Sequence, residues 1–249
     1  MRQNSFYKKR ILHIYILVLI VIILFLTAGL FMIKYNVEGE KNLPFNLKKI
    51  SIISTAESDI TQDEEENWHA GILQKNDVFF IIEKNKDYKK SDTIKEIRLE
   101  NFKVEKLNEN ANIDIYRPKS NELNYSYVDE YKVENSLVIV GGQESNQEIL
   151  QINNQGGTIA ISITEDNLGE YNFTVNEKVP SDGKLLAKAG LKAEDITFKI
   201  SFDLVIETGS QNKFKANIVL DLPTGDILEK GVSTKEISNT EDIVFKRVR

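Results

Sequence analysis

The sequence contains no cysteine, and only one of its two histidines, His69, lies outside the N-terminal 34 residues. A chain without cysteine has no disulfides and no thiolate nucleophile, so its stability must come from core burial. One histidine is too few for a zinc site of the usual His-rich kind. Neither a GxSxG nor an HExxH motif occurs. The sequence therefore predicts no catalytic, cofactor-binding or metal-binding residue.

Carboxylates are plentiful, and a glycosidase needs only two of them at a suitable separation. A carboxylate-dependent envelope hydrolase thus remains an alternative, although no pair is marked by a motif. The acidic run at 63–66 lacks the Asp-x-Asp-x-Asp-Gly spacing of a calcium loop. Asp203 lies on the polar face of a predicted strand, where it is expected to aid solubility.

Charge is absent from the 23 residues between Ile11 and Ile33, which are mostly Leu, Ile, Val and Phe. A helix of that length spans roughly 34 Å, enough to cross a hydrocarbon core of about 30 Å. A cleaved secretory signal has a shorter apolar region, of roughly 7–15 residues. The stretch LTAGL is similar to a lipobox, but Leu30 stands where the lipidated cysteine would be. Residues 11–33 are therefore predicted to be an uncleaved membrane anchor that contacts the lipid bilayer.

Basic residues precede this segment and acidic ones do not, which predicts its orientation. Arg2, Lys8, Lys9 and Arg10 lie before it, and the first acid is Glu38. Because basic flanks stay cytoplasmic, residues 1–10 are expected to be a cytoplasmic tail, with the rest of the chain outside the plasma membrane. A tail of that length is too short to fold, so a cytoplasmic effector domain is excluded on that side.

The exported part is expected to be acidic. Residues 1–34 hold five of the 32 Lys and Arg residues and none of the 38 Asp and Glu residues, which leaves a net charge of about −11 for the remainder. Such a surface repels phosphate backbones, so nucleic acid is not an expected partner.

The Asn-, Lys- and Ile-rich composition suggests an AT-rich bacterial genome, and an exported domain without cysteine fits a Gram-positive envelope.

Beyond the anchor, residues 34–49 read as a juxtamembrane linker with Gly39 and Pro44, and residues 50–249 as a β-rich domain. Short strands are expected at 48–54, at 93–107 with a bulge near Asn101, at 112–118, between 136 and 164, and at 170–175. Residues 68–84 read as a hairpin whose turn is KND. The one convincing helix covers 181–190, with Ser181 as N-cap and Gly190 as C-cap.

The clearest pattern covers residues 196–222. Apolar side chains occupy the even positions of two successive runs, separated by TGSQN. Period-two alternation on either side of a glycine-containing loop predicts an antiparallel hairpin with one buried face. A last edge strand is expected near 242–248. The predicted fold is thus mainly β: an N-terminal transmembrane helix, then an antiparallel β-sandwich-like or partly closed barrel domain with one short helix, possibly as two halves meeting near 135.

Three functions are compatible with this layout. The first is a non-catalytic docking or scaffold subunit of a bacterial envelope assembly, with an envelope protein as partner. The second is a ligand- or polysaccharide-binding domain, which requires a pocket or an aromatic cluster. Its only candidate residues are four tyrosines that flank the irregular segment 117–135: Tyr116, Tyr125, Tyr127 and Tyr131. The third is the hydrolase.

Overall fold

The computed structural model describes residues 3–62, 68–142, 149–173 and 183–248. They form two compact units, Met1–Lys41 and Asn42–Arg249. The predicted acidic run at 63–66 falls outside the described residues, as do Ser181 and Asp182 of the predicted helix.

The first unit is the helix α1 (Gln3–Glu38). Its part from His13 to Glu38 is long and apolar enough to span a membrane. Large side chains such as Leu24 and Phe25 are exposed along it. The Thr27 hydroxyl donates to the carbonyl oxygens of Ile23 and Leu24, each at 2.9 Å, so its polar group is satisfied within the helix. These features agree with the predicted anchor.

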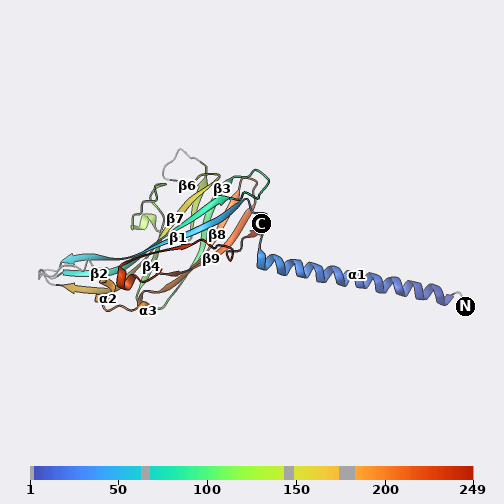
Figure 1. Ribbon diagram of the computed structural model, residues 1–249, viewed down its shortest axis with the longest axis horizontal. Helices are drawn as coiled ribbons and strands as arrows, with labels where there is room; N and C mark the ends of the chain where they lie inside the picture. Colours follow the sequence, from blue (N-terminus) through green and yellow to red (C-terminus); the bar gives the residue numbers. More distant parts are fainter. Residues whose placement is uncertain (1–2, 63–67, 143–148, 174–182, 249) are drawn as a thin grey trace. The chain divides into compact units, whose positions relative to one another are not determined.

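The second unit is a sandwich of two sheets (Figure 1). The first sheet has five antiparallel strands. In spatial order they are β10 (Val232–Ile237), β1 (Phe45–Gln62), β2 (Trp68–Lys84), β7 (Gly156–Phe173) and β4 (Asn112–Tyr116).

The second sheet has six strands. In spatial order they are β11 (Lys246–Val248), β9 (Lys213–Leu222), β8 (Phe198–Thr208), β3 (Ile94–Lys106), β5 (Ser136–Gly141) and β6 (Gln151–Ile152). All neighbours are antiparallel except β5 and β6. The predicted mainly β, sandwich-like fold is confirmed. The 196–222 hairpin is β8 and β9, and the last edge strand is β11.

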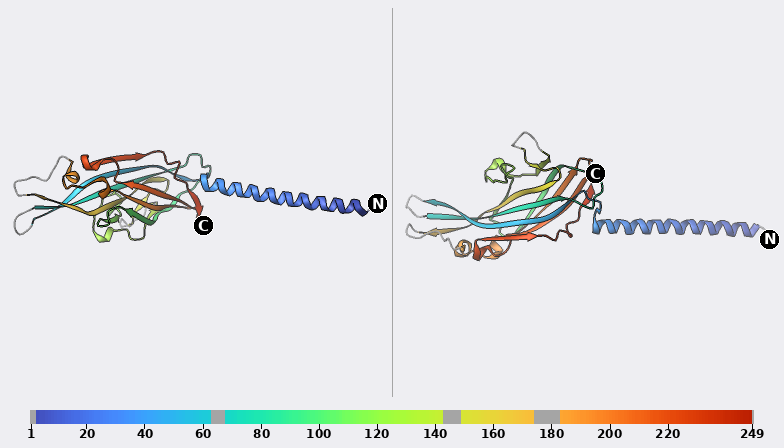
Figure 2. Two further views of the ribbon diagram at one scale, coloured as in Figure 1. Left: turned by 90° about the horizontal axis from the view of Figure 1, so that it is seen from below. Right: turned by 45° about the horizontal axis from the view of Figure 1, so that its top comes forward.

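The core lies between the two sheets. Phe80 of β2 and Phe202 of β8 are fully buried and meet edge to face, with ring centres 5.7 Å apart. A smaller second core, which includes Ile72 and Leu186, lies under three short helices. Figure 2 shows these helices near the end of the sandwich where β1, β2 and β7 project. The burial of alternate side chains on both sheets is what closes the sandwich.

The hairpin predicted at 68–84 is wrong, because β2 runs without a turn and pairs with β1 along its whole length. Asn76 and Asp77, which resemble turn residues, lie in mid-strand. Asn76 faces the interior, where its Oδ1 accepts a 2.6 Å hydrogen bond from Ser54. A buried partner on the neighbouring strand thus outweighs local turn preference. The described part of the strand predicted at 170–175 is the end of β7, and residues 174 and 175 lie outside the described residues.

The single predicted helix at 181–190 is shorter than expected, and two further helical turns are present. Its described part is α2 (Leu185–Lys188), after which Gly190 adopts a φ of +79° and Leu191 N–H bonds the Leu186 carbonyl. The other two are α3 (Ala193–Ile196) and α4 (Ile227–Lys230).

The bulge predicted near Asn101 is confirmed, since Asn101 has a φ of 60° and the β3–β8 register shifts between Glu100 and Lys103.

The linker predicted over 34–49 is shorter, because α1 continues to Glu38 and β1 begins at Phe45. Phe45 is buried in the main core, so the second unit begins earlier than residue 50.

Candidate functional site

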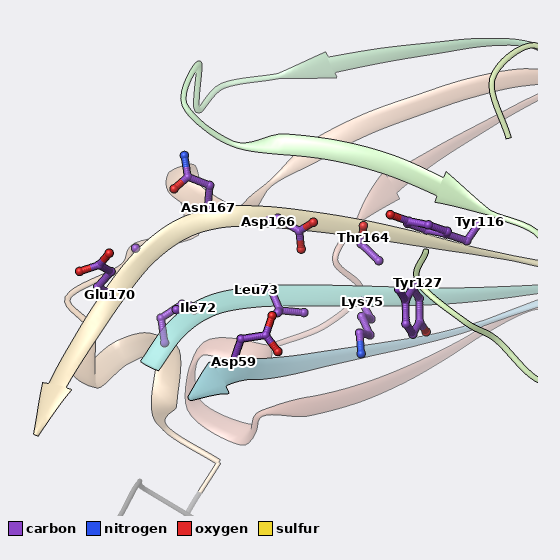
Figure 3. Close-up of a pocket in the computed structure, with 12 residues that line it drawn as sticks. Asp59, Ile72, Leu73, Lys75, Tyr116, Tyr127, Thr164, Asp166, Asn167 and Glu170 are labelled. Atoms are coloured by element: carbon purple, nitrogen blue, oxygen red, sulfur yellow. The ribbon is translucent and has the colours of Figure 1, made fainter. Parts of the chain in front are cut away.

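A concave groove lies on the outer face of the five-stranded sheet (Figure 3). Its volume is about 490 Å³, which falls within the range of small-molecule sites. Strands β1, β2, β4 and β7 and the segment 117–135 contribute its walls. The lining residues are Asp59, Gly71, Ile72, Leu73, Lys75, Tyr116, Tyr127, Thr164, Asp166, Asn167, Gly169 and Glu170.

Glycine and a bulge create the hollow. Gly71 of β2 lies between Asp59 of β1 and Glu170 of β7 in the strand register, and it leaves the space between them open. The β2–β7 register then slips, so that three residues of β7, 166–168, lie opposite the single residue Leu73. Asn167 within this bulge has a φ of 61°. Bulges re-aim side chains, and this one directs Asp166 and Asn167 to the groove.

The segment 117–135 forms the other wall because its two ends meet. Tyr116 and Lys132 form an antiparallel bridge. Arg117 N–H donates to the Tyr131 carbonyl at 2.9 Å, and Val133 N–H donates to the Ile115 carbonyl at 2.7 Å. The chain between these bridges is therefore a closed excursion, from which Tyr127 reaches the sheet.

Three of the four candidate tyrosines come together. The rings of Tyr116 and Tyr127 meet edge to face with centres 5.3 Å apart, and Tyr125 stacks on Tyr127 at 6.3 Å. Only Tyr116 and Tyr127 line the groove. The Tyr131 ring instead contacts the guanidinium of Arg117, at 4.9 Å. The aromatic cluster expected for ligand binding thus exists, without Tyr131.

The Tyr127 ring does not offer a free face for stacking. Tyr127 is covered by Tyr125, and the ammonium of Lys75 lies 4.2 Å from its ring centre. Its hydroxyl lies 3.2 Å from Ser162 Oγ. The tyrosines therefore shape and support the groove rather than serving as a stacking platform.

The charges in the groove are unequal. Lys75 is the one cation among the described residues that line it, and it forms an ion pair with Glu57 of β1. Asp59, Asp166 and Glu170 also line it, and among the described residues no ion pair links any of these three carboxylates to a cation. The groove therefore carries excess negative charge.

The excess negative charge affects the pKa of Asp166. Burial raises the pKa of its carboxyl group, and the like charges of Asp114 and Asp59 raise it further. Lys75 and Lys132 act in the opposite direction, and the net pKa shift is upward. A carboxyl group with this bias gains more from an added positive charge than one already paired.

A buried hydroxyl in the groove lacks a partner. Thr164 is 2% exposed, lines the groove, and its Oγ1 has no hydrogen bond to any described residue. In Figure 3 its side chain lies between Asp166 and Tyr116. Buried hydroxyls are normally satisfied, and a water molecule or a ligand atom would satisfy this one.

Two further buried polar groups without partners are found where the segment 117–135 covers β2. Asp77 Oδ1 and the Tyr125 hydroxyl are buried without hydrogen-bond partners among the described residues. Burial raises the pKa of both groups, and the Ser162 hydroxyl partly offsets the effect on Asp77.

The opposite face of β7 carries a buried acid. Glu165 is fully buried between the sheets, where it accepts a hydrogen bond from the Gln74 side chain. The same Gln74 nitrogen donates to the Ile196 carbonyl at 2.6 Å. Burial raises the pKa of Glu165 to about 7. Glu165 has no access to the groove and is a structural residue.

Other residues singled out by the sequence have structural roles. His69 pairs through Nδ1 with Asn172 Oδ1 at 2.6 Å, and its neighbour Trp68 stacks on Phe173. Asp203 lies in a hydrogen-bonded cluster on the outer face of the six-stranded sheet, where Lys215 is 3.1 Å away. Within the described ranges, no three His, Asp or Glu side chains converge as metal ligands would.

Comparison with protein-family models, with curated proteins and with solved structures finds no match for this chain. The geometry of the groove is therefore the basis for a functional proposal.

Proposed function

We propose that this chain is a membrane-anchored binding protein whose β-sandwich lies outside the cytoplasm and holds a polar ligand in the groove. The observation that carries the proposal is the unpartnered Thr164 hydroxyl, buried within a hollow that is lined by carboxylates and tyrosines. A preformed concavity with a few converging polar groups is the usual form of a ligand site. The basic N-terminal flank of α1 supports the proposed orientation.

Binding without catalysis is supported by the chemistry of the lining. The described lining has no histidine or cysteine, and its one aliphatic hydroxyl, that of Thr164, has no base bonded to it. A carboxylate-dependent hydrolase remains an alternative, because Asp166 has a raised pKa beside other carboxylates. Release of reducing ends from purified cell-wall polysaccharide, lost in Asp166→Asn, would support the hydrolase instead.

A docking role is the second candidate, and one edge strand favours it. In the described sheet β10 pairs only with β1, so its other edge has backbone groups available to a strand from an envelope partner. Proline at the outward-facing N–H positions of β10 would reduce capture of such a partner and would leave the groove unchanged.

Photo-crosslinking in intact cells tests the proposed function. A benzophenone side chain at Glu170, on the exposed rim of the groove, should form adducts with wall material or small molecules. The matched control is Val219, which is 52% exposed on the six-stranded sheet. Adducts at Glu170 alone support groove binding. Adducts at neither position contradict it, and protein adducts at both favour docking.

Protease accessibility tests the proposed location. In intact cells stripped of their wall, added protease should degrade the β-sandwich and leave a membrane-protected fragment that contains α1. Protection of residues 42–249 until the membrane is lysed would overturn the extracytoplasmic assignment.

A further inference from the structure

The charge of the groove identifies the class of its ligand. We propose that the groove binds an extended organic polycation, such as a linear polyamine, through Asp59, Asp166 and Glu170. This inference rests on the proposed binding function and adds the chemistry of the ligand to it.

The three carboxylates are spread along the groove. Asp59 and Glu170 flank Gly71 from β1 and β7, so two interstrand spacings, about 10 Å, separate their backbones. Asp166 lies four residues before Glu170 on β7, at the bulge. Among the described residues no three acidic side chains converge on one metal-ion position, whereas an extended chain with several ammonium groups can contact the three carboxylates in succession.

The one basic residue in the described lining of the groove, Lys75, does not cancel this charge. The ammonium of Lys75 is shared between Glu57 and the ring of Tyr127. Lys75 lies opposite Thr164 in the β2–β7 register, so the neutralised lysine and the hydroxyl share the tyrosine end of the groove, and Glu170 lies towards the other end. An anionic ligand would meet three carboxylates and is disfavoured.

Thr164 provides an observation independent of charge. Its buried Oγ1 can accept a hydrogen bond from an ammonium N–H, and nothing in the described chain takes that role. The methylene segments of a polyamine would pass over Leu73 and the bare backbone of Gly71. The carboxylates and the hydroxyl thus supply acceptors for ammonium groups, and Leu73 an apolar surface between them.

Calorimetric titration of spermidine into the full-length chain in lipid nanodiscs tests the inference. Spermidine should bind more tightly than the dication putrescine, and its affinity should fall as salt is raised. Asp166→Asn and Glu170→Gln should each weaken binding by about three- to tenfold. The matched controls Asp221→Asn and Glu105→Gln lie on the six-stranded sheet and are exposed, so they should leave affinity unchanged.

Gly71→Leu separates groove binding from general attraction to an acidic protein. A Cβ at Gly71 would meet only the Asp59 carbonyl oxygen, at 3.8 Å, so the fold should be retained while the leucine fills the groove. Loss of spermidine binding with an unchanged Tm supports the inference. Equal binding by wild type and Gly71→Leu, or no binding by wild type, overturns it.

Different results would reject the groove as a binding site and the polycation as its ligand. Adducts at Glu170 in cells together with no spermidine binding would leave the groove as a ligand site and reject the polycation. Absence of both would reject the groove itself.

Discussion

The ammonium nitrogen of Lys75 lies 4.2 Å from the centre of the Tyr127 ring and also pairs with Glu57. This contact connects the middle of β2 to a segment whose described regular structure is one 3-10 turn, η1 (Asp129–Tyr131). It explains how a polar excursion between residues 117 and 131 comes to form a wall of the groove. The cation–π contact and the ion pair each add a modest stabilisation.

Lys75→Met should therefore loosen this wall. We expect the free energy of unfolding to fall by about 1 kcal/mol, and trypsin to cleave after Lys119 faster than in the wild type. The control Lys199→Met removes a lysine of β8 whose side chain is 48% exposed and lies 4.0 Å from its carboxylate partner. Equal cleavage rates in both variants would show that Lys75 does not hold the segment.

Glu165 predicts a pH dependence of stability. Its pKa is raised from 4.5 to about 7 in the folded chain, so between these values the folded state binds the extra proton. Its contribution is present below pH 4.5 and is lost as pH rises to about 7. The loss is on the order of 3 kcal/mol.

Glu165→Gln should remove this component, because an amide does not titrate. Urea unfolding of both chains at pH 5 to 8 should show the variant gaining stability relative to the wild type as pH rises. Glu105→Gln, at an exposed position of β3, should show no such trend. Parallel stability curves for Glu165→Gln and the wild type would contradict a protonated, buried Glu165.

Phe202→Ala tests the packing of the two sheets. The side chain is fully buried against Phe80 and Phe102, whose ring centres are 5.7 and 5.2 Å away. We expect a loss of about 3–5 kcal/mol in the free energy of unfolding. Val219→Ala, on the exposed face of β9, should cost less than about 0.5 kcal/mol. Similar losses in the two variants would contradict the sandwich.

The sequence predicts those features that depend on short-range pattern. Alternation in residues 196–222 is enough to identify β8 and β9, and 23 uncharged residues are enough to predict the anchor. The unusual backbone of Asn101 is visible as a slip in the alternation. In each case the physical cause acts within a few residues along the chain.

The groove depends on partners distant in sequence, which is why the sequence does not predict it. Asn76 resembles a turn residue until Ser54 is placed beside it. Asp59 and Glu170 become neighbours of Gly71 only through the register of β1, β2 and β7. Thr164 carries no motif, and its missing hydrogen bond is visible only in three dimensions. Tyr116 and Tyr127 were identifiable as an aromatic group, but their contact depends on the bridge between Tyr116 and Lys132.

The most direct test of the account is hydrogen–deuterium exchange of the full-length chain with and without spermidine. Exchange should slow in the strand segments around the groove, residues 57–62, 68–75 and 162–171, and should stay unchanged in 198–222. Protection that is absent, or that spreads equally over both sheets, would contradict a binding site in this groove.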